Sequence, residues 1–192
     1  QYIWHCLEDK PRDYSGKNFT PYLGKAYSLE DVQTAIENNS AYINMESATD
    51  DEVLHKLKDK NIIAVFGGGS ESGRRALGNR SILADPTHDD MKDVLNHKVK
   101  HRAWFRPFAP SIIREKADAS GRLQTVTADD NPWYHRFISR WEELYGVPIV
   151  LNTSFNDREP IVENPTHAIN CFLKTNIDYL YFYDYGFLVS KK

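Results

Sequence analysis

The spacing of apolar residues along the chain predicts five amphipathic helices. In each segment, apolar side chains recur every three or four positions after a short polar residue that can accept a hydrogen bond from the first helical turn. These capping residues are Ser28, Thr49, Thr87, Asn131 and Asn164. The first three are followed three positions later by an acidic residue, as in a capping box. The last two precede a proline, which suits the first helical position.

The apolar runs between these helices are short, which is typical of buried strands. They predict strands at 42–45, 62–66, 82–84, 121–126 and 147–151. Near the end of the chain, runs at 178–183 and 187–190 flank Tyr185-Gly186 and predict a closing hairpin.

The stretch from Gly67 to Pro86 combines glycines with clustered arginines. It follows the apolar run 62–66, begins with three glycines, and contains Arg74, Arg75 and Arg80. Glycine lets a ligand approach the main chain, and guanidinium groups bind phosphate or carboxylate through paired hydrogen bonds. The stretch alone is equally consistent with an anion-binding loop and with a solvated turn.

A second basic cluster lies in the segment LNHKVKHRAWFRPFAPSII. Lys98, Lys100 and Arg102 are spaced by two, so on an extended segment they would share one face, with Arg106 following. A basic edge strand whose lysines oppose aggregation is the alternative explanation. Two basic clusters in a protein of net charge −3 favour a shared anion site.

A run of short polar side chains, Asn152-Thr153-Ser154, follows the predicted strand 147–151. Amide and hydroxyl groups offer hydrogen-bond donors and acceptors without bulk, which suits contact with a small polar ligand. An ordinary polar turn is the alternative explanation.

Composition limits the remaining classes of function. The 192 residues, 41% of them hydrophobic, are enough for one well-packed domain, which we place at 28–192. Residues 1–27 follow no periodic pattern, and we expect them to be a linker or arm from a preceding domain. The net charge of −3 argues against broad electrostatic binding of nucleic acid or of an anionic membrane. No apolar run approaches the roughly 20 residues of a membrane span.

Metal-binding spacings are missing from the sequence. The seven histidines and two cysteines provide no convincing pair at ligand spacing, so we expect no metal site formed by this chain. Cys6 and Cys171 lie far apart, which favours a reducing cytoplasm and leaves a single disulfide as the alternative.

Four motifs, taken in order, resemble a known family: SESGRRALGNRSILADP, VKHRAWFRPFAPSI, GRLQTV and GVPIVLNTSFNDREPIV. They are similar to the C-terminal domain of the O-carbamoyltransferases that modify nodulation factors, aminoglycosides and cephems, from about Leu23 to the end of the chain. The resemblance implies an α/β fold of the YrdC type, an open twisted mixed sheet with flanking helices. It also implies formation of carbamoyl-adenylate from carbamoyl phosphate and ATP, with Mg²⁺ accompanying ATP. A separate N-terminal domain would then pass the carbamoyl group to a hydroxyl acceptor.

The resemblance assigns roles to particular residues. Those expected at the carbamoyl phosphate end are Arg75, Lys100, Arg106 and Ser154, of which the first three are the expected catalytic residues. Those expected to bind the nucleotide are Arg80, Arg122, Asn152 and Thr153. Glu71 and Asp85 are candidates to contact the magnesium ion. Two departures from the family pattern concern loop shape: Arg74 replaces a frequent proline, and Gly69-Ser70 replaces an arginine and an apolar residue.

Two other functions fit the same residues. A non-catalytic nucleotide- or RNA-binding module of the same fold would show oligonucleotide affinity that falls steeply with salt, which the net charge of −3 disfavours. A docking partner that is inactive without its larger half is the third alternative.

Overall fold

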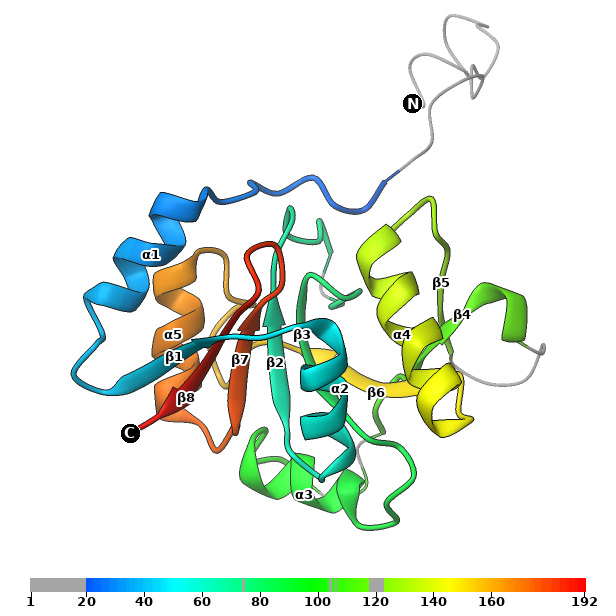
Figure 1. Cartoon of the computed structure of the whole chain (residues 1–192). Helices are drawn as coiled ribbons and strands as arrows, with labels where there is room; N and C mark the ends of the chain where they lie inside the picture. Colours follow the sequence, from blue (N-terminus) through cyan, green and yellow to red (C-terminus); the bar gives the residue numbers. More distant parts are fainter. Residues whose placement is uncertain (1–19, 74, 104, 106, 118–122) are drawn as a thin grey trace, which may run out of the picture.

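The computed structural model describes residues 20–73, 75–103, 105, 107–117 and 123–192. In this part of the chain eight strands form one mixed sheet in the order β1-β8-β7-β2-β3-β6-β4-β5 (Figure 1). The strands are β1 (Ile43–Ser47), β2 (Ile63–Phe66), β3 (Arg80–Ala84), β4 (Ser111–Ile113), β5 (Gln124–Val126), β6 (Ile149–Ser154), β7 (Tyr179–Phe182) and β8 (Phe187–Lys191). The pairs β2–β7 and β4–β5 are parallel, and the other neighbours are antiparallel. The predicted open mixed α/β sheet is therefore confirmed.

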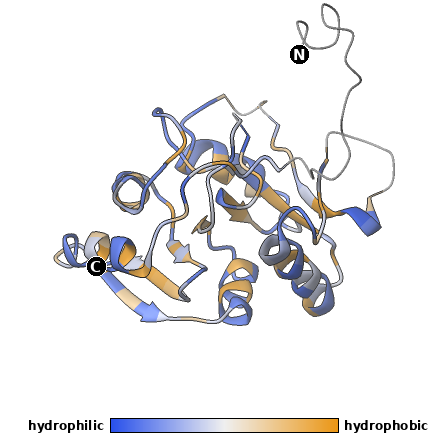
Figure 2. Ribbon diagram, turned by 90° about the horizontal axis from the view of Figure 1, so that it is seen from above, coloured by the Kyte–Doolittle hydropathy of each residue, from blue (hydrophilic) through white to orange (hydrophobic). Residues whose placement is uncertain are grey.

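Helices cover both faces of this sheet. They are α1 (Leu29–Glu37), α2 (Asp50–Lys58), α3 (Met91–Lys98), α4 (Pro132–Tyr145) and α5 (Pro165–Lys174), and a short 3₁₀ turn spans Arg114–Lys116. In Figure 2 their ribbons alternate between hydrophilic and hydrophobic colours, as expected for amphipathic helices. None of the helices in the described ranges is long and apolar enough to cross a membrane.

Strand alternation divides the apolar residues between two cores. In β2, Ala64 and Phe66 face one core with residues of α1, α3 and α5, whereas Ile63 and Val65 face the other with residues of α2 and α4. Because successive strand side chains point to opposite faces, a strand buried on both sides is apolar throughout. The short uninterrupted apolar runs in the sequence have this cause.

Four of the five predicted helix starts are confirmed. Ser28 and Thr49 form capping boxes, and Asn131 and Asn164 each accept a hydrogen bond from the first turn ahead of a proline. The predicted Thr87 cap is wrong, because α3 begins at Met91 and its preceding residue makes no side-chain cap bond. The Thr87 hydroxyl instead accepts a hydrogen bond from Lys58 Nζ, at 3.0 Å.

One strand boundary matters for function. The polar run Asn152–Ser154 lies within β6 and not in a turn that follows the strand. Within β6 it pairs with β3. On its other side, β6 pairs with β4 only through Ile149 and Val150. The second half of β6 therefore presents an edge without a neighbouring strand among the described residues.

Gly78 should be intolerant of substitution, because it brings the loop before β3 close to α4. Its φ of +111° disfavours a side chain, and a Cβ there would lie 2.4 Å from the buried Tyr134 ring. We expect Gly78→Ala to lower the free energy of unfolding by about 3 kcal/mol or more, measured by urea denaturation.

The control for this variant is Gly146→Ala. Gly146 also has a positive φ, of +74°, but a Cβ there would meet no atom within 4 Å. Its cost should be limited to backbone strain, about 1 kcal/mol. Equal losses in the two variants would contradict the proposed contact with Tyr134.

Candidate functional site

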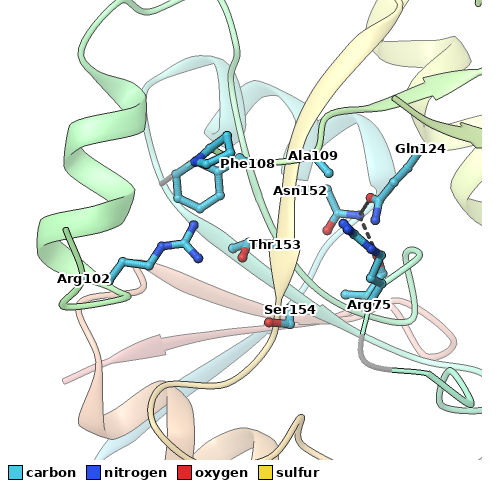
Figure 3. A pocket seen from close by; sticks show the side chains of 10 residues that line it. Arg75, Arg102, Phe108, Ala109, Gln124, Asn152, Thr153 and Ser154 are labelled. Atoms are coloured by element: carbon cyan, nitrogen blue, oxygen red, sulfur yellow. Dashed lines mark hydrogen bonds between the residues drawn. The ribbon is translucent and has the colours of Figure 1, made fainter. Parts of the chain in front are cut away.

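A cavity of about 140 Å³ opens at the unpaired half of β6 (Figure 3). It is lined by Arg75, Ala76, Arg102, Pro107, Phe108, Ala109, Gln124, Asn152, Thr153 and Ser154. Figure 3 shows Arg102, Phe108 and Thr153 on one side of β6, and Arg75, Gln124 and Asn152 on the other. The cavity therefore brings together residues from all four motifs.

The edge of β6 faces this cavity with main-chain groups. Phe155 N–H donates to Arg80 C=O at 2.9 Å, so in the antiparallel ladder the main-chain groups of Asn152 and Ser154 point away from β3. Continuing the register of β4 along β6 would place Ala109 opposite Asn152 and Pro107 opposite Ser154. Proline has no N–H to donate to the Ser154 carbonyl, and among the described residues no strand other than β3 pairs with this half of β6.

Two guanidinium groups contribute positive charge to the cavity. Arg75 is exposed and makes no hydrogen bond or ion pair with the other described residues. Arg102 is half-buried: its Nε donates to Asn96 Oδ1 at 2.7 Å, and its guanidinium carbon lies 4.6 Å from the Phe108 ring centroid. One exposed guanidinium with available donors and one guanidinium held in place suit the binding of a phosphate group.

Asn152 connects three segments around the cavity. Its side-chain nitrogen donates to Ala76 C=O, Ser111 Oγ and Gln124 Oε1 at 2.9–3.0 Å, and the residue is only 3% exposed. The Ala76 carbonyl can only accept, which fixes the orientation of the amide. The remaining atom, Oδ1, is buried and has no partner among the described residues. The Asn152 side chain therefore organises the cavity wall, and its amide hydrogens are already used in hydrogen bonds within the protein.

Comparison with known proteins agrees with the family resemblance of the four motifs. The family model described as carbamoyltransferase C-terminus matches residues 54–120 and 116–191. The chain belongs to the carbamoyltransferase C-terminal family.

Several relatives are known by name. The chain is 34% identical, over 90% of its length, to an uncharacterised protein of Methanocaldococcus jannaschii, MJ1058. It is also 34% identical to nodulation protein NolO of Bradyrhizobium diazoefficiens over 76% of its length, and 38% identical to nodulation protein NolNO of Sinorhizobium fredii over 64%. The chain spans 34%, 34% and 23% of these three proteins, so it corresponds to a minor part of each.

In this carbamoyltransferase C-terminal domain, the predicted site residues fall into three groups. Those that line the cavity are Arg75, Asn152, Thr153 and Ser154. Arg80 and Lys100 do not line it. Arg106 and Arg122 lie outside the described residues, as does Arg74. The ligand contacts assigned to these residues remain predictions.

Arg80 is a structural cation in this geometry. Its guanidinium is fully buried, lies 3.7 Å from the Phe66 ring centroid, and donates to the carbonyls of Gly67 and Gly68 at 2.6 and 3.3 Å. Burial lowers the pKa of Arg80. The side chain therefore holds the glycine loop and does not line the cavity, although the family resemblance predicts that it binds the nucleotide.

Lys100 does not line the cavity but holds the end of β6. Its Nζ donates to Ser154 C=O at 2.6 Å and to the main-chain and side-chain oxygens of Asn156 at 2.7 Å. Burial, reinforced by the nearby Arg102 charge, lowers the pKa of Lys100 to about 8. Lys100 thus fixes the turn after β6, where Ser154 Oγ also donates to Asn156 Oδ1 at 2.8 Å.

The predicted extended face of Lys98, Lys100 and Arg102 is wrong. Lys98 is the last residue of α3, and His101 has a positive φ of 45°, so the three side chains diverge. The alternative of a basic edge strand is wrong for the same reason. Only Arg102 lines the cavity, a role that the spacing alone did not single out.

The candidate magnesium ligands are both used elsewhere. Glu71 Oε1 accepts hydrogen bonds from the N–H groups of Leu77 and Asn79 at 2.7 and 2.9 Å. Asp85 is fully buried and lies 3.0 Å from Lys58 Nζ. Neither carboxylate lines the cavity, and no group of three or more potential metal-binding side chains occurs within the described ranges.

Sequence reasoning also missed Gln124. It lies at the start of β5, and its Oε1 accepts from Asn152. Gln124 lies in the GRLQTV motif, and this position could have identified it. The prediction selected Arg122 from the same motif because arginine carries a charge.

The half-buried Lys100 should give the protein a characteristic pH dependence. Because the pKa of Lys100 falls to about 8 on folding from 10.5, the unfolded chain holds a proton between these values that the folded chain has lost. The free energy of unfolding should therefore rise with pH over this window, by about 3 kcal/mol at most. Lys100→Met should abolish this rise, measured by urea denaturation at several pH values.

The exposed Lys98 supplies the matched control. Lys98→Met should follow the wild-type pH profile, since it removes a lysine from the same segment without changing a buried group. Parallel pH profiles for Lys100→Met and wild type would show that Lys100 keeps its ordinary pKa.

Proposed function

We propose that this domain binds carbamoyl phosphate in the cavity at the β6 edge and forms carbamoyl-adenylate with ATP. The observation that carries the proposal is the convergence of Arg75, Arg102 and the hydroxyls of Thr153 and Ser154 on one small cavity. Membership of the carbamoyltransferase C-terminal family supports a transferase function. Another part of the full-length protein would pass the carbamoyl group to its acceptor.

The proposed reaction balances if water takes part. Water cleaves carbamoyl phosphate into carbamate and inorganic phosphate. A carbamate oxygen then attacks the α-phosphorus of ATP, and the bond from that phosphorus to the bridging oxygen breaks to release pyrophosphate. The products are carbamoyl-adenylate, pyrophosphate and phosphate.

The chain contributes mainly positioning and charge to this reaction. Carbamoyl phosphate and ATP are both anions, so their approach requires fixed cations that offset repulsion. Arg102 is held by Asn96 and Phe108, whereas Arg75 is free to close on the bound anion. The N–H groups along the β6 edge add uncharged donors. The attack on the α-phosphorus needs no general base, because carbamate is already anionic.

Magnesium fits this proposal as a companion of the substrate. No carboxylate is among the described residues that line the cavity, so a magnesium ion there would be held by the ATP phosphates and water. Its contribution would be to offset the charge of the departing pyrophosphate.

Removal of the free cation should impair substrate binding. We expect Arg75→Ala to lower carbamoyl-phosphate-dependent pyrophosphate release, as kcat/KM, by about tenfold to a hundredfold, the range for a charged hydrogen bond to phosphate. The control is Arg136→Ala, which removes an exposed arginine from α4 and should retain wild-type activity.

The same assay can refute the proposal. Wild-type protein that releases no pyrophosphate in response to carbamoyl phosphate would exclude the adenylation reaction. Salt-sensitive binding of oligonucleotides in the absence of such turnover would favour the nucleic-acid module instead.

A further inference from the structure

We infer that residues 21–24 form a strap that holds Arg75 in position for the anion, so that the anion affinity of the cavity at the β6 edge depends on the strap. These residues precede α1, and in Figure 1 the blue segment to which they belong passes over the connection between β2 and β3 that carries Arg75. The inference deepens the proposed function and rests on it, because it makes a segment outside the cavity a positioning element for the proposed substrate.

The strap supports the chain that leads into Arg75. Gly24 N–H donates to Ser70 C=O at 3.0 Å, and Ser72 N–H donates to Pro21 C=O at 2.7 Å. Among the described residues, no main-chain hydrogen bond lies nearer to Arg75 on this side of it. The approach to Arg75 is therefore held by the strap.

The chain that follows Arg75 is held by the domain and by the strap together. Ala76 C=O accepts a hydrogen bond from the Asn152 side chain at 3.0 Å, and Leu77 C=O accepts one from the Tyr22 hydroxyl at 2.8 Å. Burial raises the pKa of Tyr22 to about 12, so this hydroxyl keeps its proton and remains a donor at neutral pH. One side of Arg75 is thus tied to β6, whereas the other side relies on the strap.

Two glycines let the strap lie main chain against main chain on this loop. A Cβ at Gly69 would lie 2.5 Å from the Gly24 carbonyl oxygen, and a Cβ at Gly24 would overlap Ser70 Oγ and lie 2.7 Å from Ser70 N. A side chain at either position would therefore displace the strap. The departure from the family pattern at Gly69-Ser70, where the resemblance expects an arginine and an apolar residue, fits a strap packed closely on this chain.

A held backbone should raise the affinity of Arg75 for an anion. Binding orders the arginine side chain, which costs conformational entropy, and a loose backbone would add to that cost. Release of the strap would free the approach to Arg75 and so weaken the anion complex. By linkage, a bound anion must strengthen the docking of the strap by the same factor.

Alanine substitution at the two contact glycines tests the inference. By calorimetry on the whole chain with inorganic phosphate, we expect Gly24→Ala and Gly69→Ala each to weaken binding by about fivefold, less than the loss of the charged hydrogen bond in Arg75→Ala. Neither glycine has a positive φ, so alanine adds no backbone strain of its own.

The matched control is Gly73→Ala, in the same loop. Gly73 is nearer to Arg75 along the chain than Gly69 is, and it too has no positive φ, but a Cβ there would meet no atom within 4 Å. Gly73→Ala should therefore bind phosphate within about twofold of wild type, as is usual for a surface substitution.

Two double variants show whether the strap acts through Arg75. The loss in Gly24→Ala/Gly69→Ala should be no greater than in either single variant, since both substitutions break the same contact. In the Arg75→Ala background, Gly69→Ala should cause no further loss. A general disturbance of the fold would instead weaken phosphate binding whether or not Arg75 is present.

Hydrogen exchange gives a readout on the strap itself. Saturating phosphate should slow amide exchange in the peptide that contains residues 20–27 by about fivefold in wild-type protein, since the coupling is reciprocal. The same treatment of Arg75→Ala should leave the exchange of this peptide unchanged.

The outcomes separate the strap from the proposed function. Wild-type phosphate affinity in Gly24→Ala and Gly69→Ala, an equal loss with and without Arg75, or a wild-type protein that binds no phosphate would each overturn the strap. Strap-dependent phosphate binding by a protein that releases no pyrophosphate would keep the strap and remove the adenylation reaction. Pyrophosphate release by Gly69→Ala with wild-type kcat/KM for carbamoyl phosphate would keep the reaction and overturn the strap.

Discussion

The buried guanidinium of Arg80 is the constraint on which the loop of the site depends. A buried charge is costly unless its donors are paired, and Arg80 is paired mainly with main-chain carbonyls, including those of Gly67 and Gly68. These carbonyls can converge on one group only if the chain after β2 turns back over β3. The rest of the loop is then held from outside by Glu71 and by the arm. Arg75 therefore extends from a loop whose backbone is held in place by these contacts.

The described cations of the basic motifs divide by how completely their donors are used. Arg80 is fully buried and Lys100 is half-buried, and both donate to protein oxygens; the low pKa of Lys100, about 8, reflects its removal from water. Arg102 Nε donates to Asn96 Oδ1, whereas Arg75 makes no hydrogen bond or ion pair with the other described residues. A ligand anion gains most from cations whose donors are still available, as those of Arg75 are. In the proposed reaction, Arg80 and Lys100 would act on the ligand through the backbone that they position.

How well the sequence predicts a feature depends on how far apart, along the chain, the residues that determine the feature lie. The capping boxes at Ser28 and Thr49 and the proline-started helices depend on neighbours three or four positions away, so the sequence specifies them directly. The Thr87 cap has the same local pattern, but Lys58, from a distant helix, takes the threonine hydroxyl. Local rules failed there because a tertiary contact competed for the same group.

The site was predictable as a set of motifs but not as a geometry. Residue type and order identified the arginines and the Asn152–Ser154 run as candidates. Which arginine faces the ligand depends on strand order and register, since Arg75, Arg102 and Gln124 meet only because β4 and β5 lie beyond β6. The hydrogen bond from the Tyr22 hydroxyl to the Leu77 carbonyl is still less visible in the sequence, because an aperiodic arm offers no pattern from which its contacts could be derived.

An unpaired strand edge is normally a liability, because its N–H and C=O groups can recruit another strand. Here the motif VKHRAWFRPFAPSI, which supplies Lys100 and Arg102, also prevents this edge of β6 from pairing with another strand. Pro107 stands where the ladder would continue and cannot donate to Ser154, so the chain runs past β6 without pairing. Lys100 then takes the Ser154 carbonyl, which leaves the edge richer in free donors than in free acceptors. Such an edge is poorly suited to bind a further strand, which needs both, and well suited to bind an anion, which needs only donors.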